Sequence, residues 1–231
     1  MREMPESEVY EGSLPFWPYK DSLASVVKLI NKNAPQKGAL LDMMCGTGYL
    51  LGEIAKKRPD LRLIGVDIDD RYVSFSRKTY PGVNIEKGDV LKWHPQSAFD
   101  VVICTGSLHH VPYDRQEKAV ANISSLVKPD GFVIVSDSYV DDYSNEFERK
   151  NAAAKLGYEY LKETIQNKAP NPVVEWTIDI MWNDVLMKEF KTSLRKRLLI
   201  FEKYFAVVDT MKTWPAIESD YGDYISILRP R

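Results

Sequence analysis

The sequence predicts an α/β protein with a seven-stranded, mostly parallel sheet that ends in an antiparallel hairpin. From about residue 37 to residue 137, short apolar runs alternate with amphipathic stretches, which is typical of repeated strand–helix units. Two further apolar runs lie near the end of the chain. The link between them, residues 213–222, is too short for a crossover helix, so these two strands are expected to be antiparallel.

Strands are predicted where apolar and β-branched residues cluster between turn signals. They are expected at residues 39–43, 61–68, 83–86, 100–104, 132–136, 206–211 and 223–228. The fourth of them, 100–104, is almost continuously apolar, as in strands that are buried on both faces.

The intervening helices are predicted from capping residues and apolar faces. Asp21 and Asp70 are good N-caps, and Asp114 is followed three residues later by Glu117, which is a capping-box pattern. Another helix is expected to follow Gly48.

Residues 140–192 interrupt the alternation of strands and helices. They are expected to form a helical insertion with a break at 169–172, and they are rich in aromatic side chains. Residues 1–36 are expected to form cap helices, so that 1–231 is a single domain with two additions. A last helix is expected to end near Tyr204, with the basic run 195–197 on a solvated face.

Composition excludes several classes of protein. The chain has 231 residues and a formal net charge of −2, so neither nucleic acid nor a membrane is indicated as the main partner. The start of the chain lacks the apolar run of a signal peptide and no stretch approaches a membrane span, so a cytoplasmic protein is expected. Two cysteines and three histidines do not supply the four close ligands of structural zinc, and no bound metal is expected.

A glycine loop follows the first strand, in the segment LDMMCGTGYL (41–50). Gly46 and Gly48 allow a sharp turn and a close approach of a ligand to the N-terminus of the next helix. The dinucleotide fingerprint needs a third glycine where Leu51 stands, and the Walker pattern needs Gly-Lys-Ser/Thr where Gly48 is followed by Tyr49. Both alternatives therefore fail, although a Gly-x-Gly loop is also compatible with a simple turn.

Two acids follow the next two strands. Asp67 lies 19 residues after Gly48, where a carboxylate can accept hydrogen bonds from both hydroxyls of a ribose. The alternative role is helix capping, for which Asp69 and Asp70 are better placed. Asp89 can accept a hydrogen bond from the amino group of adenine while Val90 donates its backbone N–H, and a simple turn aspartate is equally compatible with the sequence.

Five segments in this order resemble the class I S-adenosylmethionine-dependent methyltransferases, in their small-molecule branch. They are LDMMCGTGYL, GVDID, KGDV, FDVVICTGSLHHV and SSLVKPDGFVIVSD. The resemblance covers roughly residues 37–137, with a weaker similarity in the closing hairpin. It implies a Rossmann-like fold and S-adenosylmethionine as the cofactor.

The resemblance also implies roles for individual residues toward that cofactor. Asp42 would hold the amino group, directly or through water, and Gly46 and Gly48 would pass under the methionine part. Thr105 would lie near the methionine end. One departure from the family pattern is Met44, where a glycine is usual.

The base part of the cofactor would be held by the acids and their neighbours. Asp67 would bind the ribose, and Ile68 would pack on the adenine ring. Asp89 and Val90 would bind the edge of the adenine.

The acceptor side is less defined, because methyl transfer mainly requires alignment and needs a base only when the acceptor must lose a proton. His109, His110 and Asp137 are the candidate catalytic residues, each with a structural role as the alternative. Tyr139 and Tyr143 are candidate substrate-binding residues.

The leading functional hypothesis is methyl transfer to an oxygen, nitrogen or carbon atom of a small acceptor. The insertion 140–192 would form a lid over that acceptor, and its aromatic side chains favour an apolar or aromatic molecule. Two alternatives stay open: a module that binds the cofactor without turnover, and an enzyme that transfers another group on the same fold. A homodimer is compatible with the sequence.

Overall fold

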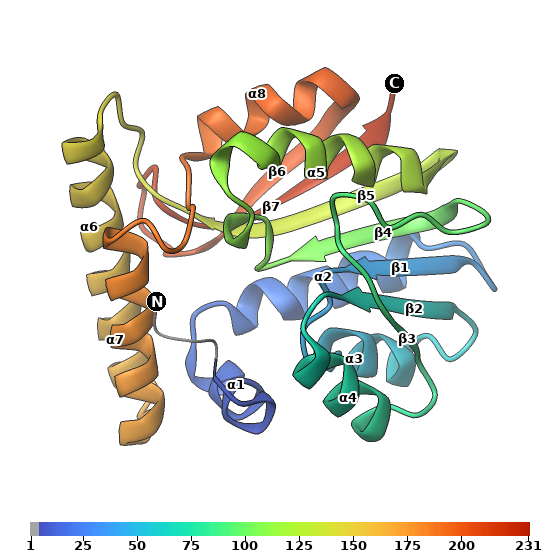
Figure 1. Ribbon diagram of the computed structural model, residues 1–231, viewed down its shortest axis with the longest axis horizontal. Coiled ribbons are helices and arrows are strands. Elements are labelled where there is room, and N and C mark those ends of the chain that lie inside the picture. The colour runs from blue at the N-terminus through green and yellow to red at the C-terminus, as the bar shows by residue number, and fades with distance from the viewer. Residues whose placement is uncertain (1–4) are drawn as a thin grey trace.

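The computed structural model of the protein describes residues 5–231. Figure 1 shows a central sheet with helices on both faces and a pair of helices at one end. The strands are β1 (Ala39–Met43), β2 (Arg62–Asp67), β3 (Asn84–Lys87), β4 (Phe99–Thr105), β5 (Val127–Tyr139), β6 (Phe205–Trp214) and β7 (Gly222–Pro230). The helices are α1 (Ser7–Ser13), α2 (Lys20–Asn33), α3 (Tyr49–Lys57), α4 (Asp70–Thr79), α5 (Tyr113–Leu126), α6 (Glu146–Gln166), α7 (Asn171–Val185) and α8 (Leu194–Tyr204), with short 3₁₀ turns η1 (Leu14–Phe16) and η2 (Leu108–His110).

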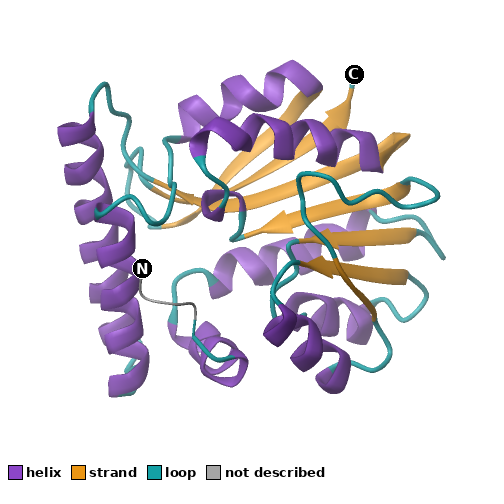
Figure 2. Cartoon of the chain, viewed as in Figure 1, coloured by secondary structure: helices purple, strands orange, loops and turns teal. Residues whose placement is uncertain are grey.

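The strand order is β3-β2-β1-β4-β5-β7-β6. β1 to β5 run parallel, whereas β7 is antiparallel to both β5 and β6. The predicted fold class is therefore confirmed, including the closing hairpin. Figure 2 shows the resulting three layers, with strands between two layers of helices.

The sheet separates two apolar cores because side chains alternate along each strand. On β5, Ile134 faces the core beneath α2 and α3, while Val133 and Val135 face the core beneath α5 and α8. The central strand β1 is buried along its whole length. The same alternation decides toward which side of the sheet each side chain at the carboxyl end of β5 points.

Three predicted helix caps are wrong. α2 begins at Lys20, so Asp21 lies within its first turn and does not cap it. α4 begins at Asp70, but the capping side chain is that of Asp69, which accepts a hydrogen bond from the backbone N–H of Arg71 at 2.9 Å. α5 follows Pro112 and has no side-chain cap bond. The carboxylate of Glu117 instead pairs with Lys203 of α8 at 2.7 Å, because it points across the helix layer rather than back along its own helix.

The insertion between β5 and α8 contains α6 and α7, which lie side by side at the carboxyl edge of the parallel strands (Figure 1). A Cβ on Gly157 would lie 2.3 Å from Cγ of Met181, so the two helices pack too closely for a larger residue there. The Arg149 guanidinium of α6 donates to the backbone carbonyls of Asp184 and Val185, both at 2.8 Å, and so caps the end of α7.

The solvated face predicted for the basic run 195–197 is wrong for one residue. Arg195 is exposed and pairs with Asp142, but Arg197 is only 1% exposed. Arg197 lies on the inner face of α8, where its charge acts on Asp137 of β5. A buried charge that follows an exposed one at a spacing of two residues is not visible from composition alone.

α8 provides a direct test of this packing. Phe201 is fully buried between α8 and the sheet, whereas Leu199 on the same helix is 53% exposed. Phe201→Ala is expected to lower the free energy of unfolding by about 3–5 kcal/mol, because it leaves a cavity. Leu199→Ala is expected to change it by less than about 0.5 kcal/mol. Equal effects in chemical denaturation would contradict the arrangement of α8.

Candidate functional site

Two cavities meet at the carboxyl edge of the sheet. The large cavity has a volume of about 400 Å³ and lies over the ends of β1, β2 and β4, while the small cavity of about 80 Å³ lies beneath α6 and α7. Both are lined by Tyr10, Tyr19, Gly106, His110 and Glu189. These five residues form a shared wall, through which ligands in the two cavities would meet.

The glycine loop forms one side of the large cavity. Its backbone has positive φ at Met44 (65°), Gly46 (54°) and Gly48 (78°). The N–H groups of Met44 and Cys45 both donate to the carbonyl of Val66, at 2.7 and 3.0 Å, which fixes the loop to the end of β2. A left-handed conformation costs a non-glycine residue roughly 1–2 kcal/mol, so Met44 stores strain where the family usually has glycine.

Only one of the two glycines lines the large cavity. Gly46 does so, and its N–H donates to Oδ2 of Asp67 at 2.8 Å. Gly48 lies outside it, and a Cβ there would be 2.0 Å from Oγ of Ser76 on α4. The second glycine therefore allows α3 to pack against α4, in addition to allowing the turn.

The two acids and their apolar neighbours line the large cavity. Asp67 accepts hydrogen bonds from the N–H groups of Gly46 and Asp69, and burial raises the pKa of its carboxyl. Oδ1 of Asp89 accepts from the N–H of Leu91 at 2.9 Å, so the turn role is present together with access to the cavity. Ile68 lines the same cavity and is 61% exposed, which leaves an apolar surface for a ligand to cover.

The remaining residues expected to contact the cofactor divide into two groups. Val90 and Thr105 line the large cavity. Asp42 lies beneath it and is 1% exposed, and its Oδ1 has no hydrogen-bond partner among residues 5–231. Burial and then the charge of Asp67 raise the pKa of Asp42 well above its usual range.

The first histidine forms a buried pair with Asp137. Nδ1 of His109 lies 2.5 Å from Oδ1 of Asp137, which also accepts from the N–H of Ser138 at 3.0 Å. Burial lowers the pKa of His109, so the ring is neutral near pH 7. With Asp137 as the acceptor, the proton of the ring lies on Nδ1 and Nε2 stays basic. Asp137 itself is 1% exposed and lies behind the ring.

The second histidine forms an ion pair with the insertion. Nδ1 of His110 lies 2.5 Å from Oε2 of Glu189 in the segment after α7. Burial alone would lower the pKa of His110, but the Glu189 carboxylate raises it above its usual value. Burial likewise acts to raise the pKa of Glu189, and the charge of His110 lowers it to about 2. Of the two histidines, His110 is thus the one whose pKa is raised and whose charged form is favoured.

His109, His110 and Glu189 also form a group whose potential metal-ligating atoms lie within 4.8 Å of one another. The 2.5 Å contact between His110 and Glu189 is that of a hydrogen-bonded ion pair, and an ion would have to separate these two atoms. The charge of the nearby Lys191 ammonium disfavours a positive charge on either histidine and would repel a metal cation in the same way. The arrangement therefore favours a proton between His110 and Glu189 over a divalent metal ion bound by the three residues.

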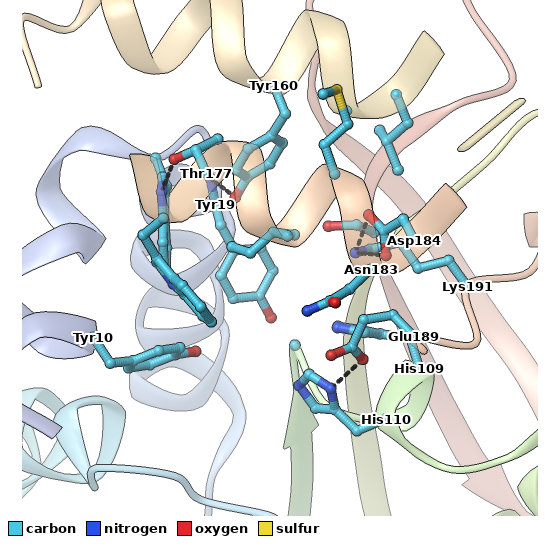
Figure 3. Close-up of a pocket in the computed structure, with 18 residues that line it drawn as sticks. Tyr10, Tyr19, His109, His110, Tyr160, Thr177, Asn183, Asp184, Glu189 and Lys191 are labelled. Carbon is cyan, nitrogen blue, oxygen red and sulfur yellow. Dashed lines mark hydrogen bonds and ion pairs between the residues drawn. The ribbon is translucent and has the colours of Figure 1, made fainter. Parts of the chain in front are cut away.

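The small cavity has an aromatic side and a charged side, as Figure 3 shows. Its aromatic lining residues are Tyr10, Trp17, Tyr19, Tyr160 and Trp176. On the other side, Nζ of Lys191 contacts both carboxylate oxygens of Asp184, at 2.7 and 2.8 Å, and both side chains are buried.

The two tyrosines expected to bind the substrate line neither cavity. Tyr139 is 1% exposed and packs edge-to-face against Tyr224. The alternation along β5 directs Ser138, not Tyr139, into the small cavity. The ring of Tyr143 lies against α8, with Nζ of Lys196 at 3.3 Å from its centre.

Sequence reasoning missed the charged residues that the insertion contributes. Asp184, Glu189 and Lys191 line the small cavity, but they lie in a stretch without any motif or characteristic spacing. No pattern in the sequence marked these three charged residues as buried or as neighbours. Their contacts to η2 and to one another depend on how the insertion folds back.

A comparison with known families agrees with this geometry. Residues 40–131 match a family model described as a methyltransferase domain, which runs from β1 into β5 and includes the glycine loop and both histidines. The matched segment is thus similar to a methyltransferase domain, and it contains most of the motifs that resemble the class I S-adenosylmethionine-dependent methyltransferases. The match ends before the insertion that contributes the charged side of the small cavity.

Individual relatives of this chain are distant. A carboxy-S-adenosyl-L-methionine synthase of Nitratiruptor sp. is 26% identical over 171 residues, which are 67% of this chain and 70% of the relative. A malonyl-[acyl-carrier protein] O-methyltransferase of Halalkalibacterium halodurans is 25% identical over 170 residues, 66% of this chain and 58% of the relative. A solved TehB-like SAM-dependent methyltransferase from Corynebacterium glutamicum shares the fold, with a TM-score of 0.62 at 15% identity over 97% of this chain and 98% of that one.

Within residues 5–231, none of the helices combines the length and the apolar character needed to cross a bilayer.

The packing role of Gly48 can be tested by adding one methyl group. Gly48→Ala is expected to lower the free energy of unfolding by about 2 kcal/mol, from left-handed strain and the contact with Ser76. Gly46→Ala has open space and is expected to cost only about 1 kcal/mol. Gly82→Ala, which has neither strain nor a neighbour, is the control. If Gly46→Ala lowers the free energy of urea unfolding more than Gly48→Ala does, the packing role of Gly48 is wrong.

The ion pair between His110 and Glu189 predicts a pH window of stability. The pKa of Glu189 falls from 4.5 to about 2 on folding, so its contribution is present above pH 4.5 and is lost as the pH falls toward 2. The pKa of His110 rises above 6.5, so its contribution is present below pH 6.5 and is lost as the pH rises through the folded value. The stabilisation by the pair is thus largest between these limits.

The measurement is the free energy of unfolding of the wild type and of Glu189→Gln from pH 3 to 9. The difference is expected to reach about 3 kcal/mol near pH 5–6 and to shrink on both sides, since about 2.5 pKa units correspond to that energy. Glu8→Gln on the exposed side of α1 is the matched control and is expected to show no such window. A difference independent of pH would exclude the ion pair as its cause.

Proposed function

We propose that this protein transfers the methyl group of S-adenosylmethionine to an oxygen, nitrogen or carbon atom of a small acceptor. The observation that carries the proposal is the wall shared by the two cavities. The large cavity contains the loop and acids that family resemblance assigns to the cofactor, and the small cavity has room for an acceptor beside it. Alignment of two ligands at such a boundary is the main requirement of methyl transfer.

The lining of the large cavity fits this cofactor. Asp67 would accept hydrogen bonds from the ribose, Asp89 and Val90 would bind the adenine edge, and the exposed side chain of Ile68 would be covered by the ring. The unpartnered Oδ1 of Asp42 would hold the amino group through water. When bound, S-adenosylmethionine supplies a methyl group on a cationic sulfur that leaves as a neutral thioether.

The chain's own contribution to the reaction is proton transfer at the acceptor. His109 lines the small cavity and is neutral, so Nε2 is the proposed proton acceptor when the acceptor atom carries a proton. Asp137 is proposed as a positioning residue that fixes the tautomer of His109, because it is buried behind the ring. His110 is not proposed as the base, because its pair with Glu189 raises its pKa and favours its protonated form. It forms part of the shared wall.

The proposal is tested first by calorimetric titration with S-adenosylmethionine, with NAD as the negative control. Asp67→Asn is expected to weaken binding at least tenfold, since hydrogen bonds to a charged group contribute about 1.5–3 kcal/mol. Asp70→Asn, at an exposed position at the start of α4, is the matched control and is expected to bind normally. Folded wild type that binds NAD or neither ligand would overturn the proposal. Product mass then separates methyl transfer from transfer of another group.

The role of His109 predicts an acidic limb in kcat with a midpoint below pH 6.5. The limb follows from burial, which lowers the pKa of the ring against the opposing effect of Asp137, with His110 and Lys191 acting in the same direction as burial. His109→Gln is expected to lower kcat by about 100-fold or more while cofactor binding stays unchanged. Asp137→Asn is expected to lower kcat with little change in KM. An unchanged pH profile in His109→Gln would exclude this residue as the base.

A further inference from the structure

The aromatic side of the small cavity offers ring faces, because several of its polar atoms are already bonded. Nε1 of Trp17 donates to Oγ1 of Thr177 at 2.9 Å. The hydroxyl of Tyr19 donates to the carbonyl of Ser136 at 3.1 Å, and the hydroxyl of Tyr160 accepts from the N–H of Tyr19. A planar molecule can therefore pack between these rings without competing for their hydrogen bonds.

On the charged side, each ion that lines the cavity has an opposite partner. Lys191 is paired with Asp184 through two contacts, and His110 is paired with Glu189. The ammonium of Lys191 is 7% exposed and the carboxylate of Asp184 is 3% exposed, so neither is solvated to any extent.

The charged groups behind the cavity do not line it. Asp137 accepts a hydrogen bond from neutral His109, whose interaction outweighs burial and lowers the pKa of the Asp137 carboxyl, and the buried guanidinium of Arg197 acts in the same direction. Asp223 accepts a hydrogen bond from the hydroxyl of Ser138, and burial raises the pKa of its carboxyl to about 7.

Among the charged side chains that line the cavity itself, Asp184 and Glu189 face Lys191 and His110. This balance has a direct energetic consequence for acceptors. A carboxylate that took Lys191 as its counter-ion would compete with Asp184 for the same ammonium, and separating the two would leave Asp184 buried and unpaired. An ammonium ion would separate the same pair from the other side. Breaking a buried pair by removing one partner is strongly destabilising, and a neutral molecule does not incur this cost.

We propose that the small cavity selects an uncharged, planar acceptor with a weakly acidic O–H or N–H group, and that the pair of Lys191 and Asp184 excludes carboxylates and ammonium ions. The proposal rests on the proposed methyl transfer and narrows its acceptor to neutral phenol-like or heteroaromatic molecules. Lys191 and Asp184 are thereby specificity-determining residues.

The test uses three ring-bearing probes of similar size: phenol, benzoate and benzylammonium. Their binding to the wild type saturated with S-adenosylhomocysteine is measured by calorimetry at pH 7.5. Phenol is expected to bind at least tenfold more tightly than either ion. Equal or tighter binding of benzoate or benzylammonium, or no binding of any probe, would overturn the proposal.

Two variants are expected to switch the preference. Asp184→Asn leaves Lys191 without its partner, so benzoate binding should improve at least tenfold relative to phenol. Lys191→Met leaves Asp184 without its partner, so benzylammonium should improve instead. The exposed pair of Lys155 and Asp141 on the same insertion, also at 2.7 Å, provides the matched control. Asp141→Asn should leave all three affinities unchanged.

Folding of each variant is checked by thermal unfolding and by binding of S-adenosylhomocysteine. If a single variant does not fold, the double change Asp184→Leu with Lys191→Met removes both charges and should keep the preference for phenol. A double variant that binds benzoate as well as phenol would contradict the proposal. If the folded wild type does not bind S-adenosylhomocysteine, the proposed function is refuted. If it binds S-adenosylhomocysteine but prefers benzoate to phenol, only this inference is refuted.

Discussion

The parallel pairing of β1 with β2 on one side and β4 on the other is the constraint on which the site depends. It brings the ends of three strands to one edge, so that the glycine loop, Asp67 and Thr105 surround one cavity although they are far apart in sequence. The hydrogen bond from Gly46 to Asp67 then joins the loop to the end of β2. Strain at Met44 is tolerated because two hydrogen bonds to Val66 hold the loop in place.

A second constraint is that charges buried at this edge need partners. The insertion meets it by placing Glu189 against His110 and Lys191 against Asp184. The same residues line the small cavity, so that under the proposed selection of a neutral acceptor the stability of the insertion and the choice of acceptor would depend on the same ion pairs. A substitution that improves one of these properties is therefore expected to alter the other.

The two cavities differ in how much of their lining falls within the family match. The family match covers residues 40–131, which include the loop, the acids and both histidines. Asp184, Glu189 and Lys191 lie outside it, as do the aromatic residues of the insertion. The family match therefore includes much of the lining of the large cavity but not the charged side of the small cavity.

The sequence by itself determined the succession of strands along the chain, the closing hairpin and several of the residues that line the large cavity, because these follow from local periodicity and from motifs of fixed spacing. Strand β1 was predicted at the residues where it is found, Ala39–Met43. Only the tertiary structure decided that Gly48 packs against α4, that Tyr139 points away from the small cavity and that Arg197 is buried. The charged side of the small cavity likewise had no sequence signal, since Asp184, Glu189 and Lys191 meet the sheet only through the path of the insertion. Long-range packing and charge pairing depend on that path, and no local pattern of residues encodes it.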